Sequence, residues 1–228
     1  MNLTHRLAII VAIEIVYMAA TRITIHYLPW ASVEAELIRT ALRIATATIY
    51  WQLMKPLILS KKPNLGTRRR TSLIIGLLLF FSVPVLVGYE GLNVKLALLF
   101  AITSIPVGIK EELLFRGILQ NFLEEKWGSL AAIFITSAIF SAWHIGVAEP
   151  IFWVFAQIFL VSILLGFIYI RTGSIVLVIV LHALYDALFA FTPFLSTPAN
   201  GNLAVIILLI SVLLVFRWAH LDRSIAKH

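Results

Sequence analysis

The sequence lacks cysteine altogether and is short of charge. None of its 228 residues is cysteine, which excludes disulfide bonds, thiol nucleophiles and metal sites built on cysteine. Charged residues make up 13% of the chain, whereas a soluble domain carries about 25%. No stretch is polar enough to form an appended soluble domain. We therefore interpret residues 1–228 as a single integral-membrane domain.

Apolar residues take the place of the missing charge. Hydrophobic residues make up 61% of the chain, and its mean hydropathy is +0.99. Several apolar runs reach the ~20 residues that a helix needs to cross a bilayer. The sequence therefore predicts an all-α fold, a polytopic transmembrane helix bundle embedded in the lipid bilayer.

Eight apolar segments account for the predicted bundle. We place them at residues 1–20, 35–59, 71–88, 94–126, 130–147, 151–170, 174–191 and 202–219. The first segment has the basic start and apolar run of a signal peptide. However, Glu14 lies within it and no small-residue cleavage site follows, so we expect an uncleaved span.

Basic residues indicate the orientation of the bundle. Lysines and arginines cluster around the loop at residues 55–70, and such clusters are typical of the cytoplasmic side. Eight spans then place both termini in the cytoplasm, with all but four of the 18 lysines and arginines on or near that side. The net charge of +7 is thus typical of membrane topology and contact with anionic headgroups, and we expect no nucleic-acid partner.

The four exceptions are Arg22, Arg39, Arg43 and Lys95. The first three, with Glu36, either face the interior of the bundle or extend along it to the membrane surface. Long charged side chains readily reach the surface while their stems stay in the apolar region. We therefore expect this group to lie at the membrane surface.

Three short polar segments interrupt the apolar runs of the second half. They are Lys110-Glu-Glu-Leu-Leu-Phe-Arg116, Phe140-Ser-Ala-Trp-His144 and His182-Ala-Leu-Tyr-Asp186. Ionisable groups at membrane depth are costly and are kept where they pair or serve a function. Gly128 is the predicted tip of a helical hairpin, and Glu112 and His144 each lie 16 residues from it. At ~1.5 Å per residue, both sit about 24 Å from the tip and so at the same depth.

Helical spacing pairs the side chains within each segment. Three pairs share the i,i+4 spacing: Glu112 with Arg116, Phe140 with His144, and His182 with Asp186. Glu111 points about 100° away from Glu112 and can face another partner. The Asp186 carboxylate can hold one ring N–H of His182 and so set its tautomer. Carboxylates and two histidines in a dry cavity are suited to activating a water and stabilising an oxyanion.

The order of these motifs, Glu-Glu-x-x-x-Arg, Phe-x-x-x-His and His-x-x-x-Asp, resembles the CPBP family. This family comprises the CAAX proteases and bacteriocin-processing enzymes, also called the Abi family, and includes the type II CAAX prenyl endopeptidases. The resemblance covers about residues 95–190, and the other spans match only as generic membrane helices. It implies an intramembrane endopeptidase that hydrolyses a peptide bond in a membrane-associated protein or peptide.

The resemblance also implies a role for each motif residue. Glu111 would be the general base that, with His144, activates a water. Glu112 and Arg116 would support the site, and Phe140 would pack the helix of His144. His182 and residue 186 would stabilise the oxyanion.

One position departs from the family pattern. Many members have Asn where this chain has Asp186, and an ionised Asp only accepts hydrogen bonds. We therefore expect Asp186 to orient and charge His182, and His182 to be the donor to the oxyanion.

Several alternatives stay open at this point. We expect no cofactor, but members of the family have also been described as metalloproteases. A zinc-dependent version would use Glu111, His144 and His182 as ligands. Outside the proteases, the same residues would serve a proton-coupled transporter as a relay, or the chain would be a non-catalytic, immunity-type membrane protein. Loss of cleavage or of flux in Glu111→Gln discriminates among these. The small size and short loops favour a prokaryotic cell (inner) membrane.

Overall fold

The computed structural model describes residues 3–61, 70–87, 93–145, 152–195 and 201–220. In these ranges the chain is helical and contains no strand, which confirms the predicted all-α class. The helices are α1 (Leu3–Tyr27), α2 (Val33–Ile58), α3 (Arg70–Val87), α4 (Val94–Glu112), the π-helix η1 (Leu113–Gln120), α5 (Asn121–Trp143), α6 (Phe152–Thr172), α7 (Ile175–Leu195) and α8 (Gly201–His220). Three of the six basic residues predicted to be cytoplasmic, Lys62, Arg68 and Arg69, lie outside the described residues.

Polar residues at the expected places begin the helices. The Ser32 side chain accepts a hydrogen bond from the Ala35 N–H at 3.2 Å and so caps α2. The Asn93 side chain caps α4 in the same way, through the Leu96 N–H at 3.0 Å. Such caps satisfy backbone donors that a helix start leaves free, and they set the boundaries close to those predicted.

The predicted hairpin tip is present at Gly128. Its φ of 77° and ψ of 169° break the helical path inside α5, so residues on either side form two helical arms. A positive φ favours glycine, because other residues meet a steric penalty there. The turn therefore lies where the sequence predicts it, between Trp127 and Ser129.

The long helical stretch predicted over residues 94–126 is present, but its centre is wound differently from its ends. Leu113–Gln120 is a π-helix, and seven of its eight residues are buried. A π-helix adds roughly one residue per turn to the α-helical path and is frequent at functional sites. The wider winding carries Arg116 while the preceding α4 carries Glu111 and Glu112.

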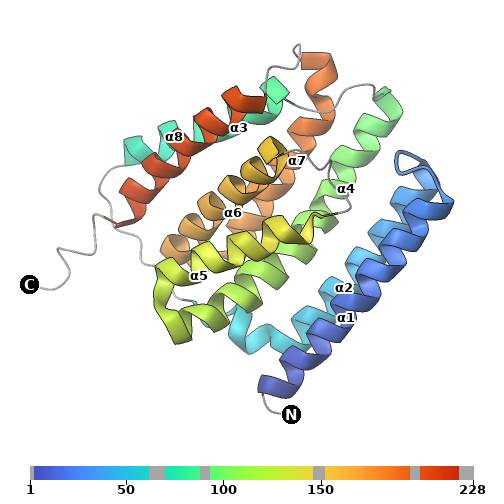
Figure 1. Ribbon diagram of the computed structural model, residues 1–228, viewed down its shortest axis with the longest axis horizontal. Coiled ribbons are helices and arrows are strands. Elements are labelled where there is room, and N and C mark those ends of the chain that lie inside the picture. The colour runs from blue at the N-terminus through green and yellow to red at the C-terminus, as the bar shows by residue number, and fades with distance from the viewer. Residues whose placement is uncertain (1–2, 62–69, 88–92, 146–151, 196–200, 221–228) are drawn as a thin grey trace, which may run out of the picture.

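The helices pair across the molecule in a way that places α4 and α7 at its centre. Figure 1 shows α1 beside α2 on one side and α3 beside α8 on the opposite side. Between these pairs, α4 packs on α7 and α5 packs on α6. All three motif-bearing segments therefore lie in the interior layer of the bundle.

The outer surface and the helix lengths identify an integral membrane protein. Large apolar side chains such as Val16, Leu78 and Ile102 are exposed on the outside of the bundle. Within the described ranges, four helices are long and apolar enough to cross a membrane: Leu3–Tyr27, Phe152–Thr172, Ile175–Thr192 and Gly201–Ala219. The shorter Arg70–Leu86 is also apolar. The remaining helices carry more charge, part of which is buried, as at Glu36, Lys110 and Arg116.

Glu36, Arg39 and Arg43 of α2 lie inside the bundle, so the prediction that this group reaches the membrane surface is wrong. Glu36 is 2% exposed and Arg39 is 6% exposed. Glu36 accepts hydrogen bonds from Arg39 and from Arg43, each at 2.6 Å. These bonds offset the cost of removing the charges from water, which each residue would otherwise carry alone. Arg22 is exposed and donates to the carbonyl oxygen of Ile145 at 3.3 Å.

Small residues allow α4 and α7 to approach closely. A Cβ at Gly108 would lie 3.1 Å from the carbonyl oxygen of Ile179 and 3.4 Å from the amide nitrogen of Ala183. Next to it, the Ser104 hydroxyl donates to the carbonyl oxygen of Ala183 at 2.9 Å. Small residues and hydroxyl bonds are the usual means of packing helices within membranes.

We expect Gly108→Ala to push α4 away from α7, because the new methyl group meets backbone atoms that cannot rotate away. The expected loss is about 1–3 kcal/mol of unfolding free energy, measured by denaturation in detergent. Gly201→Ala is the matched control, since its Cβ would meet side-chain atoms at ordinary distances of 3.5 and 3.6 Å. Equal stability of the two variants would contradict the close-packed seam.

Candidate active site

Three helical segments supply the predicted site residues. The end of α4 and η1 carry Glu111, Glu112 and Arg116, α5 carries Phe140 and His144, and α7 carries His182 and Asp186. Packing of α4 on α7 and of η1 on α5 brings these segments together. The structure therefore gathers residues that lie up to 75 positions apart, from Glu111 to Asp186.

Glu112 is the centre of the buried half of the site. One of its carboxylate oxygens, Oε1, accepts from Arg116 Nη1 at 2.9 Å and from His182 Nδ1 at 2.7 Å. Glu112 and Arg116 are completely buried. Because an ionised carboxylate only accepts, the bond assigns a proton to His182 Nδ1.

This geometry adds a second carboxylate to the predicted partner of His182. Asp186 Oδ2 lies 3.4 Å from Nε2, on the same helix, as predicted. Glu112 makes the shorter bond, at 2.7 Å, to the other ring nitrogen, Nδ1. Spacing along one helix identifies Asp186 as a neighbour of His182, but the closer carboxylate comes from another helix.

The Nε2 nitrogen of His182 faces the open half of the site. Glu111 Oε2 lies 3.9 Å from it, on the opposite segment from Asp186. The Glu111 side chain is 15% exposed and the Asp186 side chain is 37% exposed, in contrast to the sealed Glu112. His182 thus joins a buried carboxylate on one nitrogen to two accessible carboxylates on the other.

His144 is the cap residue that follows α5, and its ring lies against the same Phe140 ring as His182 does. Its Nδ1 is 2.8 Å from the carbonyl oxygen of Phe140, which can only accept, so Nδ1 carries the proton of this bond. The other nitrogen, Nε2, is then the one that can take part in chemistry. Glu111 interacts electrostatically with both His144 and His182.

Phe140 is the apolar body between these polar groups. Its ring centroid lies 4.9 Å from that of His144 and 6.1 Å from that of His182. Phe115 packs edge-on against it at 4.8 Å, and the Arg116 guanidinium carbon lies 5.1 Å from the ring centroid. Phe140 therefore holds the positions of both histidines and Arg116 by packing.

Sequence reasoning missed Ser162 of α6. Arg116 Nη2 donates to the Ser162 carbonyl oxygen at 2.9 Å and to its hydroxyl oxygen at 3.0 Å. These bonds fix the guanidinium from the side opposite Glu112. Ser162 is a small polar residue in an apolar span and belongs to none of the three motifs. The sequence therefore carries no signal for its role.

Lys110 has a partner that sequence reasoning also missed. Its Nζ lies 2.8 Å from Glu14 Oε1 and 2.9 Å from Glu14 Oε2, and the Tyr50 hydroxyl donates to the same carboxylate. Lys110 Nζ also lies 4.0 Å from the centroid of the Tyr17 ring. The isolated Glu14 in an otherwise apolar segment was the available signal. The charge next to Glu111 in the chain is therefore neutralised by α1.

The described side chains do not form a metal-binding group. No set of three or more histidines, aspartates and glutamates within the described ranges is arranged to hold an ion. The proposed zinc ligands Glu111, His144 and His182 are all among those residues. We therefore derive no step through a metal.

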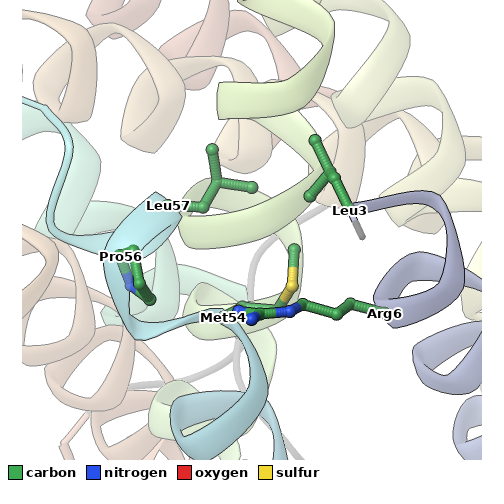
Figure 2. Close-up of a pocket in the computed structure, with 5 residues that line it drawn as sticks. All are labelled: Leu3, Arg6, Met54, Pro56 and Leu57. Atoms are coloured by element: carbon green, nitrogen blue, oxygen red, sulfur yellow. The ribbon is translucent and has the colours of Figure 1, made fainter. Parts of the chain in front are cut away.

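Figure 2 shows a cavity at a different place, where the start of α1 meets the end of α2. Leu3, Arg6, Met54, Pro56 and Leu57 line it. Arg6 there donates to the carbonyl oxygen of Leu53 at 2.8 Å. The lining contains none of the predicted site residues, so this cavity is not the candidate active site.

We expect Glu14→Leu to be strongly destabilising, because it leaves the Lys110 ammonium buried without its partner. Breaking a buried pair costs about 3–5 kcal/mol, whereas replacing both partners by apolar residues is often neutral. The double variant Glu14→Leu with Lys110→Met should therefore be more stable than Glu14→Leu alone, as measured by thermal unfolding in detergent.

The matched control is the pair Lys61–Glu124, which is closer to the surface, with side chains 18% and 19% exposed. Glu124→Gln should cost less than about 1 kcal/mol. A larger cost for Glu124→Gln than for Glu14→Leu would contradict the buried-pair interpretation.

Comparison with known proteins gives one match. Residues 93–188 match the family model described as type II CAAX prenyl endopeptidase Rce1-like. The matched segment runs from the cap of α4 into α7 and includes every residue of the candidate site. No curated protein and no solved structure matches the chain. Residues 93–188 are thus similar to the type II CAAX prenyl endopeptidase family, in agreement with the resemblance found from the three motifs.

Proposed function

We propose that the chain is an intramembrane endopeptidase that hydrolyses a peptide bond in a membrane-associated protein or peptide. The observation that carries the proposal is the orientation of His182. Glu112 holds Nδ1 at 2.7 Å, so that Nε2 faces Glu111 and Asp186 on the accessible side of the site. The match of residues 93–188 to the type II CAAX prenyl endopeptidase family model supports the same activity.

Glu111 is the proposed general base. As a carboxylate it takes a proton from a water molecule, whose oxygen then attacks the carbonyl carbon of the peptide bond. His144 shares in holding the water through Nε2, because its Nδ1 is occupied by the Phe140 carbonyl. When the carbon–nitrogen bond breaks, the proton passes from Glu111 to the departing amine, and the products are a carboxylic acid and an amine.

His182 is the proposed donor to the oxyanion that forms on the attacked carbonyl. In its protonated form Nε2–H donates while Nδ1–H stays bonded to Glu112. Asp186 lies 3.4 Å from Nε2 and keeps this edge of the ring directed toward the reacting carbonyl. A donor positioned before the reaction begins is worth more than one that must reorganise.

Glu112 and Arg116 are proposed as positioning residues. Neither is accessible to a substrate, since both are completely buried. Arg116 joins Glu112 of α4 to Ser162 of α6, so the carboxylate that orients His182 is itself fixed from two helices. Second-layer contacts of this kind commonly determine the orientation of a catalytic ring.

The same proposal extends to the membrane arrangement. All eight helical segments cross the bilayer, with both termini in the cytoplasm of a prokaryotic cell (inner) membrane. The inward charges of α1, α2 and α4 support this, because Glu14 pairs with Lys110 and Glu36 pairs with Arg39 inside the bundle. Paired charges that face inward are compatible with a membrane span.

The test is proteolysis by purified protein in liposomes, with wild type, Glu111→Gln and His144→Ala against membrane-associated peptides. We expect Glu111→Gln to lower kcat by about 10²–10⁴-fold, since general-base catalysis is worth that much. Glu125→Gln, which removes an exposed carboxylate of α5, should retain wild-type activity. Retention of cleavage by Glu111→Gln would refute the proposed base.

Each reaction is run with and without a chelator. Cleavage that is unaffected by chelator supports a metal-independent glutamate mechanism. Cleavage that is lost and then restored by zinc assigns Glu111, His144 and His182 to a zinc-dependent version instead. If solute or ion flux, and not cleavage, responds to Glu111→Gln, the chain is a transporter.

The positioning residues give a separate prediction. Glu112→Gln keeps the shape of the side chain but allows an amide N–H to face His182, so kcat should fall at least about tenfold. KM should change little, because the buried carboxylate does not contact substrate. Ser162→Ala leaves the Ser162 carbonyl as a partner for Arg116, and its effect should stay below about tenfold. Steady-state kinetics separate the two outcomes, and a larger effect of Ser162→Ala would contradict this division.

A further inference from the structure

Lys110 is a buried cation that the proposed reaction does not use. The residue is 1% exposed. Its Nζ lies 2.8 Å and 2.9 Å from the two carboxylate oxygens of Glu14, on α1. The Tyr50 hydroxyl of α2 donates to the same carboxylate. The position of the ammonium is therefore fixed by two other helices, and Lys110 stands one residue before the proposed base Glu111.

Two aromatic rings lie beside the same ammonium. The Lys110 Nζ lies 4.0 Å from the centroid of the Tyr17 ring and 5.2 Å from that of the Trp143 ring. Both distances are within the ~6 Å over which a cation is attracted to the face of an aromatic ring. The attraction is strongest for tryptophan and where water is excluded. Lys110 thus contacts α1 through Glu14 and Tyr17, and α5 through Trp143.

Trp143 is the last residue of α5, and the residue that follows it is His144. The end of a helix has fewer backbone hydrogen bonds than its interior, so side-chain contacts there have more influence on its position. The Trp143 ring contacts Lys110 and lies edge-on to Phe115, with 6.3 Å between the ring centroids. Both partners come from the segment that carries Glu111, which is α4 followed by η1.

Stability alone does not account for this arrangement. Taking a lysine and a glutamate out of water is costly, and replacing a buried ion pair by apolar residues of similar size is often neutral or stabilising. An apolar pair would join α1 to α4 at least as well. A methyl group, however, exerts no comparable attraction on the face of an aromatic ring, whereas the Lys110 ammonium attracts the ring of Trp143.

We propose that Lys110 is a positioning residue for the proposed reaction. Its ammonium, held by Glu14, fixes the Trp143 ring. The ring in turn sets the place of His144 relative to Glu111. This inference rests on the proposed protease function, in which these two residues activate one water from different helices. Their alignment depends on contacts between the helices, and the contact of Lys110 with Trp143 joins their neighbours in the chain.

The proposal gives α1 a part in the reaction. The family model matches residues 93–188, so Glu14 and Tyr17 lie outside the matched segment. Glu14 is 4% exposed, which leaves it out of reach of a substrate. Helix α1 thus acts on the reacting groups through Lys110 and Trp143, by holding them in place and not by contact with the substrate.

The experiment uses the double variant Glu14→Leu with Lys110→Met, because a single replacement leaves one charge buried without its partner. The double variant removes the ammonium and should stay folded, which thermal unfolding in detergent verifies. In cleavage of membrane-associated peptides in liposomes, we expect kcat to fall roughly 10- to 100-fold, since a small displacement of the catalytic groups is costly. KM should change less than about threefold, because neither residue contacts substrate.

A mutant cycle with Trp143 separates positioning from a general loss of stability. Trp143→Leu alone should lower kcat as the double variant does, and Trp143→Phe, which keeps a ring face for the cation, should lower it less. Adding Trp143→Leu to the double variant should lower kcat by less than about twofold more, because the contact is already lost. Effects that multiply would show that the two changes act independently, and they would overturn the inference.

The matched control is the double variant Lys61→Met with Glu124→Leu. It removes an ion pair between the residues after α2 and the first turn of α5, without altering the contact of Lys110 with Trp143. Its kcat should stay within about twofold of wild type. An equal fall of kcat in this control overturns the inference, and so does a wild-type kcat in the folded variant of Glu14 and Lys110.

A spectroscopic measurement removes the dependence on catalysis. The six tryptophans are replaced by a fluorinated tryptophan, and the fluorine NMR signal of Trp143 is identified by its absence from Trp143→Phe. This signal should shift and broaden in the double variant of Glu14 and Lys110, while that of Trp218 on α8 stays in place. An unchanged Trp143 signal overturns the inference whether or not the protein cleaves peptides. If wild type cleaves no peptide but the signal responds, Lys110 positions the end of α5 and the protease proposal fails.

Discussion

The carboxylate of Glu112 is the group on which the candidate site depends. One oxygen accepts from Arg116 and from His182, so a single buried anion fixes a cation of η1 and a ring of α7. An anion at this depth is tolerated only with partners, and its partners are held only while it is charged. The pairing and the orientation of His182 are therefore one arrangement, and neither can be changed without the other.

The same requirement extends to the helices outside the family segment. Glu14 of α1 neutralises Lys110, and Glu36 of α2 pairs with Arg39 and Arg43 inside the bundle. Helices α1 and α2 thus complete the electrostatic surroundings of residues contributed by α4 and α7. Charges that would be costly singly are instead buried in groups of opposite sign.

Sequence reasoning could predict the parts of this arrangement that depend on one helix or one turn. Gly128 marks the hairpin tip because a positive φ favours glycine, and equal distances from it place Glu112 and His144 at one depth. Helical spacing alone predicts that Glu112 can reach Arg116. These features depend on local geometry, which a single sequence records directly.

The parts that could not be predicted depend on distances between helices. Spacing pairs His182 with Asp186, but the closest carboxylate belongs to Glu112 on another helix. The sequence around Arg39 and Arg43 is the same whether these side chains face the membrane surface or the interior. Their direction depends on how α1 packs against α2. The π-helical winding of η1 has no residue pattern of its own, since leucine, phenylalanine and isoleucine are equally common in α-helices.

The seam between α4 and α7 also limits how a peptide can arrive. With Gly108 against the backbone of Ile179 and Ser104 bonded to Ala183, these two helices form a closed wall behind His182. Separating them would break the alignment of His182 that catalysis is proposed to require. The entrance must therefore lie on the side of Glu111 and Asp186, where the carboxylates are accessible. A substrate approaching from there would meet the reacting groups before any sealed part of the bundle, so the wall behind His182 need not move during a catalytic cycle.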